Sequence, residues 1–526
     1  MRKLPLLLGV FFPRVKTLLL PIALVIGAVL SARADVRLPA LLGDHAVLQQ
    51  DCEVSLWGWA WEGETVIIET SWGVKTQTTA DARGEWRIRI RTPRARPLDQ
   101  GIHREYITFT APNENAVQIK DILIGEVWLC SGQSNMTMMM GPDFPPGHND
   151  WYGDKFWKEE SGKTDRPALR LYNVEKTARA LPRDDCKGVL PDHVTLPTNA
   201  MGLTPELRTG WQICAPGTAQ YFSAVAYYFG AMLQEKLNVP VGLIASDVGG
   251  TPIESWISLE SLRALPAYSQ AVTRVHRDGR AALFNGMIAP LTPATIRGVL
   301  WYQGESNVGA SAADYAALLK TLIADWRRHF NREDLPFGIV QLANFGEPWR
   351  ESNAALVREA QAAVASQVPG AGLAVAIDLG DVRIHPPDKR NVAKRLALWA
   401  RAAVYGEKGL VFQSPLYKSH VVAGGKILVR FDTGGSPLMV GRKDSRDEIQ
   451  EAPDGRLEAF EIAGTDGKFV RADARIEGDS VAVSAREAPR PVTVRYAWAD
   501  NPEGCNLYNK AGLPASPFRT DGLAER

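Results

Sequence analysis

The chain has 526 residues, of which 45% are hydrophobic and 23% are charged, so it is long enough to form two or three globular domains. Its net charge of +1 at pH 7 gives no electrostatic signature of binding to nucleic acid or to an acidic membrane surface. We therefore expect a neutral or weakly charged substrate and no nucleic-acid partner.

Residues 1–34 have the composition of a signal peptide. Basic residues precede an apolar run from Leu18 to Leu30, and Ala32-Arg33-Ala34 supplies a small-x-small cleavage site. The alternative is a membrane anchor, but the run is short for a span and contains Pro21. We expect an exported protein, periplasmic or secreted, with no stable membrane insertion after cleavage of the signal.

Residues 35–120 alternate apolar and polar side chains in short runs, such as Val54–Ala60 and Glu85–Arg91, separated by Gly, Asn and Asp. This pattern predicts an N-terminal antiparallel β-sandwich module. The tryptophans of the module offer a platform for sugar binding. Bulky indole rings are usually buried in small cores, however, so core packing is the favoured interpretation.

Residues 121–410 change to apolar strands that alternate with segments of helical periodicity. Gly372–Asp378 is typical of a buried strand, whereas Tyr315–Trp326 and Asn391–Tyr405 have the periodicity of helices. Such alternation predicts an α/β domain with a parallel, doubly wound sheet. Short strands return in residues 411–526 and predict a C-terminal β-rich module.

The central stretch of the α/β domain is the apolar run Asp121–Leu129, which leads through Gly132 to Ser134. Glycine permits a sharp turn, so we expect Ser134 at the carboxyl end of a buried strand, where open α/β sheets place reactive groups. Backbone N–H groups and the positive end of a helix dipole favour an oxyanion at such a turn. Ser134 is therefore the candidate nucleophile, and a serine N-cap is the alternative reading of this motif alone.

Three further strands end in polar motifs, within Val241–Trp256, Leu300–Asn307 and Asp378–Lys389. The chain resembles the sialate O-acetylesterase-like family of SGNH-type serine esterases from about Leu38 to Thr520. The motifs that carry this resemblance are Gly-Gln-Ser-Asn-Met, Trp-Tyr-Gln-Gly-Glu-Ser-Asn and Ile-His-Pro-x-x-Lys. The resemblance implies a flavodoxin-like SGNH hydrolase fold and the removal of O-acetyl groups from carbohydrates.

The hydroxyl of a serine needs a base whose pKa lies near neutrality, and histidine fits this requirement. Only His385, among eight histidines, follows a strand beside a helix start in the catalytic region and matches the Ile-His-Pro block. SGNH esterases commonly place Asp three residues before this histidine, where this chain has Val382. We choose Asp381 as the residue that orients the imidazole, with Asp378 or a backbone carbonyl as alternatives.

For the oxyanion hole, we expect the backbone N–H of Ser134 to act with that of Gly249 or Gly250. The resemblance makes Gln303 and Asn307 the candidates for a side-chain donor.

The segment 141–165 follows the nucleophile turn and carries aromatic side chains, which either stack on sugar rings or hold a long loop against the body. The acid Glu305 cannot donate a hydrogen bond while ionised, and tying neighbouring loops together is its alternative role. The candidate substrate-binding residues are Gln133, Trp151, Trp157 and Glu305.

Cys186 and Cys214 bracket a polar insertion, and we predict a disulfide between them, with two free thiols as the equally weighted alternative. The motif Arg358-Glu-Ala-Gln361 also matches the family, but its residues indicate no catalytic role, and a salt bridge on a helix surface is its alternative reading. Met136 occupies the place of the last glycine of a Gly-x-Ser-x-Gly elbow, which argues against an α/β-hydrolase. The sequence has no metal-binding motif, so no metal or organic cofactor is implied.

These observations predict an exported serine esterase that removes acetyl groups from acetylated plant polysaccharides or oligosaccharides through an acetyl-serine intermediate. One alternative is a sialate O-acetylesterase that acts on O-acetyl sialic acids. Another is a non-catalytic carbohydrate-binding protein. The sequence leaves the oligomeric state open.

Overall fold

The computed structural model describes residues 36–112, 115–141, 153–189, 209–269, 279–350, 353–444 and 448–522. The predicted signal peptide and Trp151 lie outside the described residues. Among the helices of these described ranges, none is both long enough and apolar enough to cross a membrane.

A central sheet organises the molecule, and its strands run in the order β13-β12-β11-β7-β10-β8-β9. Neighbouring strands are parallel, apart from the antiparallel pair of β8 and β9 at one edge. The strands are β7 (Val117–Gly132), β8 (Arg166–Asn173), β9 (Gln212–Cys214), β10 (Val241–Asp247), β11 (Gly298–Tyr302), β12 (Phe337–Val340) and β13 (Ala371–Ala374). The predicted α/β class with a parallel sheet is confirmed.

The strand β7 lies at the point where the direction of strand order reverses, because β10 is on one side of it and β11 on the other. In the register of the sheet, Gly132 at the end of β7 lies between Asp247 of β10 and Tyr302 of β11. The loops that follow these three strands therefore meet at one edge. Parallel sheets bind ligands at such a switch point.

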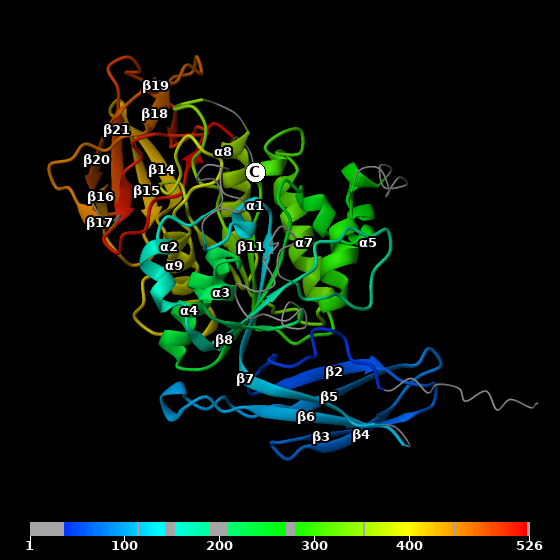
Figure 1. The fold of residues 1–526 in the computed structure, drawn as a ribbon. Coiled ribbons are helices and arrows are strands. Elements are labelled where there is room, and N and C mark those ends of the chain that lie inside the picture. The colour runs from blue at the N-terminus through cyan, green and yellow to red at the C-terminus, as the bar shows by residue number, and fades with distance from the viewer. Residues whose placement is uncertain are drawn as a thin grey trace, which may run out of the picture.

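Helices cover both faces of the sheet, and the alternation of side chains along β7 shows why. Val127 and Leu129 belong to one hydrophobic core, whereas Trp128 and Cys130 belong to another on the opposite face. The first core includes α7 (Tyr315–His329) and α8 (Ala354–Gln367), and the second includes α4 (Ala224–Leu237) and α9 (Lys389–Trp399). The shorter α5 (Leu259–Arg263) packs beside α7 (Figure 1).

The N-terminal strands lie at the lower end of the molecule in Figure 1. Strands β2 and β5 form one antiparallel sheet, β4, β3, β6 and the first half of β7 form another, and β1 pairs with β7 in parallel. Trp86 of β5 packs on Phe109 of β6, with 5.7 Å between ring centroids, and so joins the two sheets. Trp57 is also buried, which confirms core packing for these two indoles, whereas Trp61 is 45% exposed. The strands are β1 (Val47–Gln49), β2 (Glu53–Trp59), β3 (Thr65–Thr70), β4 (Lys75–Thr79), β5 (Glu85–Arg91) and β6 (Glu105–Thr110).

The first half of β7 pairs with β6, and the second half enters the central sheet. One continuous strand therefore links the N-terminal sheets to the edge at which Ser134 lies.

The C-terminal strands form further antiparallel sheets, at the upper left of Figure 1. Val375 and Ile377, which follow β13, belong to the hydrophobic core of these sheets, so this part packs directly on the α/β domain. The strands are β14 (Leu416–Ala423), β15 (Lys426–Asp432), β16 (Leu438–Lys443), β17 (Ile449–Glu451), β18 (Phe460–Ala463), β19 (Val470–Arg471), β20 (Asp473–Glu477), β21 (Ser480–Ser484), β22 (Thr493–Tyr496), β23 (Leu507–Asn509) and β24 (Phe518–Arg519).

The guanidinium of Arg358 joins the α/β domain to the C-terminal segment. This side chain is wholly buried in α8 and donates to the carbonyl oxygens of Leu342, Ala343, Ala499 and Asp500 at 2.6–2.9 Å. The reading of a surface salt bridge is therefore wrong for Arg358, whereas Glu359 of the same motif forms a partly exposed ion pair with Arg519 at 3.2 Å. Arg358 instead satisfies four backbone acceptors that belong to loops far apart in the sequence.

The predicted disulfide is also wrong, because Cys186 and Cys214 are both buried free thiols. The Sγ of Cys214 lies 3.3 Å from the carbonyl oxygen of Thr164. Burial raises the pKa of each thiol to about 12, so neither has the thiolate character that disulfide exchange requires.

Candidate active site

The turn that carries Ser134 depends on a glycine that no other residue can replace without distortion. Gly132 has a φ of 147°, and a Cβ at this position would overlap the carbonyl oxygen of Tyr302. The N–H of Gln133 donates to that same oxygen at 3.0 Å. The chain then enters α1 (Ser134–Thr137), so Ser134 lies at the end of β7, as predicted. Since α1 has only four residues, its dipole contributes little.

The imidazole of His385 meets this serine directly, with 2.9 Å between its Nε2 and the Oγ of Ser134. His385 lies in the loop between β13 and α9, 251 residues further along the chain, and is half-buried. Burial, and then the charge of Lys389, lower the pKa of His385 to about 4, below the near-neutral pKa expected for the base. At neutral pH the imidazole is therefore uncharged and able to accept a proton from the hydroxyl.

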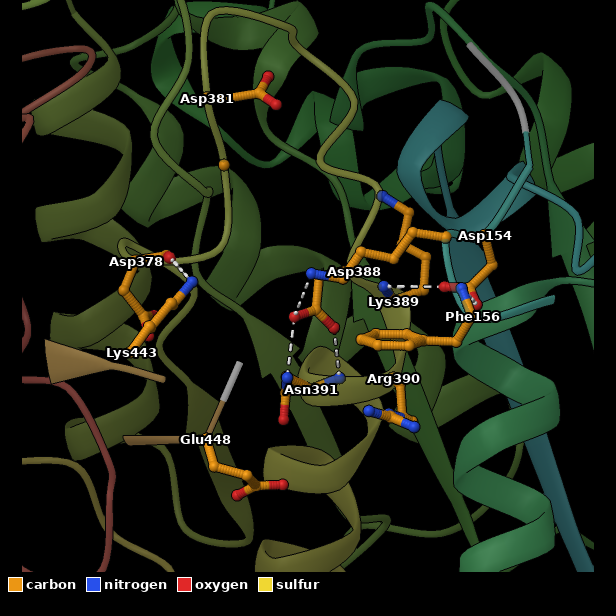
Figure 2. A network of polar contacts seen from close by, with 12 residues as sticks. Asp154, Phe156, Asp378, Asp381, Asp388, Lys389, Arg390, Asn391, Lys443 and Glu448 are labelled. Carbon is orange, nitrogen blue, oxygen red and sulfur yellow. Dashed lines mark hydrogen bonds and ion pairs between the residues drawn. The ribbon is translucent and has the colours of Figure 1, made fainter. Parts of the chain in front are cut away.

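The structure corrects the interpretation of Asp381. Its carboxylate accepts hydrogen bonds from the backbone N–H of Arg383 at 2.8 Å and from the guanidinium of Arg383 at 2.6–3.1 Å, and its contacts do not include His385. These bonds lower the pKa of Asp381. Figure 2 shows Asp381 on the loop, apart from the polar groups at the start of α9.

The alternative carboxylate, Asp378, is also bound elsewhere. It forms a bidentate pair with Arg395 at 2.7 and 2.8 Å and accepts a further bond from Tyr508. Burial alone would raise the pKa of Asp378, but the charge and hydrogen bonds of Arg395 lower it. A backbone carbonyl that orients the imidazole stays a prediction.

Of the two glycines expected to contribute to an oxyanion hole, Gly249 lies beside Ser134. A Cβ added to Gly249 would lie 3.4 Å from the Cβ of Ser134, whereas one added to Gly250 would have nothing within 4 Å. Within the described part of the chain, no hydrogen bond uses the backbone N–H of Ser134 or Gly249. Both groups are therefore available as donors, and Gly249 rather than Gly250 is the residue beside the serine.

The side chains proposed as further donors have other partners. Asn307 donates to Glu254 and Ser311, both at 2.9 Å, and is wholly buried. Gln303 donates from Nε2 to Asn307 at 2.7 Å, to Gln133 at 3.1 Å and to a backbone carbonyl. Neither amide has a hydrogen left for a substrate oxygen. The prediction of oxyanion roles for Gln303 and Asn307 is corrected, since both hold the surrounding loops together.

The amide of Gln133 has a divided role. Its Oε1 accepts from Gln303 and from the backbone N–H groups of Gly304 and Ser306, at 3.1–3.3 Å. Its Nε2 makes no hydrogen bond to any residue in the described ranges, so Gln133 stays a candidate for contact with substrate.

Asn135, next to the serine, was missed as a functional residue. Its Nδ2 donates to Glu305 Oε1 at 2.5 Å and to the carbonyl oxygen of Ile384 at 3.1 Å, and its Oδ1 accepts from Lys389 Nζ at 2.5 Å. Glu305 therefore joins loops, which is the alternative considered for it. Asn135 and Lys389 belong to the motifs that carry the family resemblance, and this was the available signal.

Of the two aromatic candidates, only Trp157 is described. It begins α2 (Trp157–Glu160), is half-buried and packs with Phe156 against the core on the α4 and α9 face. Phe156 also lies under the guanidinium of Arg390, 3.5 Å from its ring centroid (Figure 2). These aromatic side chains hold the segment against the body, which was the alternative to stacking on sugar. No group of His, Cys, Asp and Glu side chains in the described ranges is arranged to hold a metal ion.

A serine hydrogen-bonded to a histidine at the switch point of a parallel sheet is the arrangement of a serine hydrolase. A family model described as "Carbohydrate esterase, sialic acid-specific acetylesterase" matches residues 209–397. The sialate O-acetylesterases of Pongo abelii and Homo sapiens are each 31% identical to the chain, over 95% of the chain and 95% of each relative. A carbohydrate acetylesterase from Xanthomonas citri, of known crystal structure, is 33% identical with a TM-score of 0.78, over 92% of this chain and 99% of that one. The chain belongs to the sialate O-acetylesterase family of carbohydrate esterases.

Proposed function

We propose that the protein is an exported carbohydrate O-acetylesterase that works through an acetyl-serine intermediate. The observation that carries the proposal is the 2.9 Å contact between Ser134 Oγ and His385 Nε2 beside two uncommitted backbone N–H groups. A binding protein without activity has no use for an uncharged imidazole held against a serine hydroxyl, so the non-catalytic alternative is disfavoured.

In the first half of the reaction, Ser134 Oγ attacks the acetyl carbonyl while His385 Nε2 takes the hydroxyl proton. The N–H groups of Ser134 and Gly249 stabilise the negative charge that develops on the carbonyl oxygen. The tetrahedral intermediate collapses, the sugar oxygen leaves with the proton from His385, and the acetyl group remains on Ser134. Water then attacks the acetyl-serine, with His385 again taking a proton, and acetate leaves as the proton returns to Ser134.

The proposed fold of the catalytic domain is that of a flavodoxin-like SGNH hydrolase. When β8 and the edge strand β9 are set aside, the remaining order β10-β7-β11-β12-β13 places the first of these five strands between the second and the third. This is the flavodoxin-like order, and it supports the assignment.

For the sugar, acetylated plant polysaccharide or oligosaccharide stays our proposal, and O-acetyl sialic acid is the second candidate. The polysaccharide proposal began from aromatic side chains near the serine, and the packing of Trp157 against the core weakens that support. The names of the relatives favour the second candidate. Arg383 lies in the loop of His385 and pairs with Asp381, and its guanidinium offers a charged donor for an ion pair with a sialate carboxylate.

The activity is tested with an aryl acetate, on which Ser134→Ala should abolish turnover while the thermal midpoint stays unchanged. The sugar is tested by acetate release, at equal acetyl concentration, from acetylated xyloglucan, acetylated xylan and 9-O-acetyl sialic acid. A kcat/KM on the sialic acid ester ten times that on either polysaccharide corresponds to about 1.4 kcal/mol of transition-state preference. That result would make O-acetyl sialic acid the preferred candidate substrate.

Export is proposed from the sequence of residues 1–34. Expression of the full chain should give a mature protein outside the cytoplasm whose first residue is Asp35, as read by N-terminal sequencing. Recovery of the intact chain from the cytoplasm alone would refute export.

A further inference from the structure

Lys389 is a cation in a place that is electrostatically unfavourable. Its side chain is wholly buried, and it is the first residue of α9, where the partial positive charge of a helix N-terminus opposes a cation. Burial lowers the pKa of Lys389 to about 7, although the nearby carboxylates oppose the shift. An aliphatic side chain would fill the same space without these penalties, so the ammonium group needs another explanation.

The ammonium group has a small and well-defined set of contacts. Its Nζ donates to Asn135 Oδ1 at 2.5 Å and lies 5.4 Å from the centroid of the Tyr302 ring. The same Asn135 amide donates to the carbonyl oxygen of Ile384, the residue before His385. Lys389 is therefore connected through one side chain to both partners of the serine–histidine pair, since Asn135 follows Ser134 directly in the chain.

The charged groups around this arrangement come from several elements. The acids that act on Lys389 are Glu305, which follows β11, Asp154, which precedes α2, and Asp388, the N-cap residue of α9. Figure 2 shows Asp154 and Asp388 beside Lys389. Lys155 pairs with Asp388 at 3.4 Å, and in the loop before His385 the charges of Asp381 and Arg383 pair with each other.

We propose that Lys389 is a positioning residue for His385, which holds the imidazole loop against the Ser134 turn through Asn135 and keeps the imidazole uncharged by its own positive charge. This inference rests on the proposed esterase function. Lys389 stays protonated where His385 titrates, because the pKa of Lys389 is about 7 and that of His385 is about 4. A positive charge nearby disfavours a second one on the imidazole.

The test compares Lys389→Met with Lys394→Met, assayed on an aryl acetate from about pH 4 to about pH 8. Lys394 lies on the same helix, is half-exposed and pairs with Glu448 at 3.4 Å, so it controls for loss of a lysine charge on α9. In Lys389→Met, we expect the acid limb of kcat/KM to move to higher pH by about one unit and kcat to fall about tenfold, with KM unchanged. The profile of Lys394→Met should match the wild type.

A Lys389→Met enzyme with lower kcat but an unmoved acid limb would overturn the proposal, because removal of the Lys389 charge must raise the pKa of His385 if that charge helps to lower it. If that variant does not fold, Lys389→Gln removes the charge while an amide still donates to Asn135, and the same shift is expected. The wild type gives an independent test by NMR titration of the His385 ring, since a pKa near the ordinary value of about 6.5 would also overturn the proposal.

Failure of the esterase function has a different signature. In that case the wild type would hydrolyse no acetyl ester, or Ser134→Ala would retain the activity, whatever the behaviour of Lys389→Met.

Discussion

Asp381→Asn separates an acid that orients His385 from one that shapes the loop before it. The change keeps the size of the side chain. In the wild type the backbone N–H of Arg383 donates to Asp381 Oδ1 at 2.8 Å, and the Oδ1 of an asparagine can still accept this hydrogen bond. The negative charge is lost, and with it the ion pair to the Arg383 guanidinium. Because every hydrogen bond of Asp381 within the described ranges goes to Arg383, we expect the substitution to leave the serine–histidine contact intact.

The expected magnitude follows from exposure. The side chains of Arg383 and Asp381 are 35% and 41% exposed, so their pair belongs to the surface class, worth about 0.2–1 kcal/mol. If all of that energy were lost in the transition state, kcat/KM would fall by about fivefold at most. Removal of the acid from a working Ser-His-Asp triad costs on the order of 10⁴-fold in kcat.

The assay is kcat and KM on an aryl acetate near neutral pH, with Asp378→Asn as the matched control. Asp378 is buried in its pair with Arg395, so this control should lose roughly 3–5 kcal/mol of unfolding free energy in urea, with little change in kcat for the folded fraction. A loss of about a thousandfold or more in kcat for Asp381→Asn, at an unchanged thermal midpoint, would refute the reasoning. It would mean that Asp381 reaches His385 in the working enzyme.

Arg358→Met should lower the free energy of unfolding by about 3–5 kcal/mol in urea, because four buried carbonyl oxygens lose a charged donor. The control Glu359→Ala breaks a partly exposed pair with Arg519 and should lower it by less than about 1 kcal/mol. Equal losses of unfolding free energy in the two variants would contradict the role of Arg358 as a buried donor to four backbone carbonyl oxygens. Gly132→Ala should abolish esterase activity, since a methyl group there overlaps the Tyr302 carbonyl oxygen, and wild-type kcat would count against the rigidity of the turn. Addition of dithiothreitol should leave the thermal midpoint unchanged, and thiol titration of the unfolded chain should give five thiols, since Cys186 and Cys214 are free; a lower midpoint would indicate a disulfide.

The parts that sequence predicted well are those whose information is local. The apolar run before Gly132 and the helical periodicity of Tyr315–Trp326 specify a strand and a helix by their own repeats, and both form. Ser134 was found because its motif directly follows a strand, and His385 was found because its motif precedes a helix and matches the family block. The strand order then brings the two motifs together across 251 residues.

The failures concern polar side chains that have several possible partners. The sequence placed Asp381 four residues before His385, but Arg383 is closer along the loop and takes its carboxylate. The amides of Gln303 and Asn307 were made candidates by the family resemblance. Burial makes them satisfy one another, since an unpaired amide inside a protein is costly. Such choices depend on which loops meet in space, which local patterns do not encode.

Most polar residues of the family motifs therefore act on the backbone of the site, and few of them face a substrate. Gln133 fixes the turn after β11, Gln361 donates to the carbonyl oxygen of Gln303, and Asn135 fixes the residue before His385. A serine and a histidine on separate loops keep a 2.9 Å contact only if both loops are held to within a fraction of that distance. Each buried amide holds a loop by satisfying backbone groups that would otherwise lack partners, so a change at any of these positions moves the reacting atoms as well as weakening the fold. This explains why residues without a reaction of their own lie in the same motifs as Ser134 and His385.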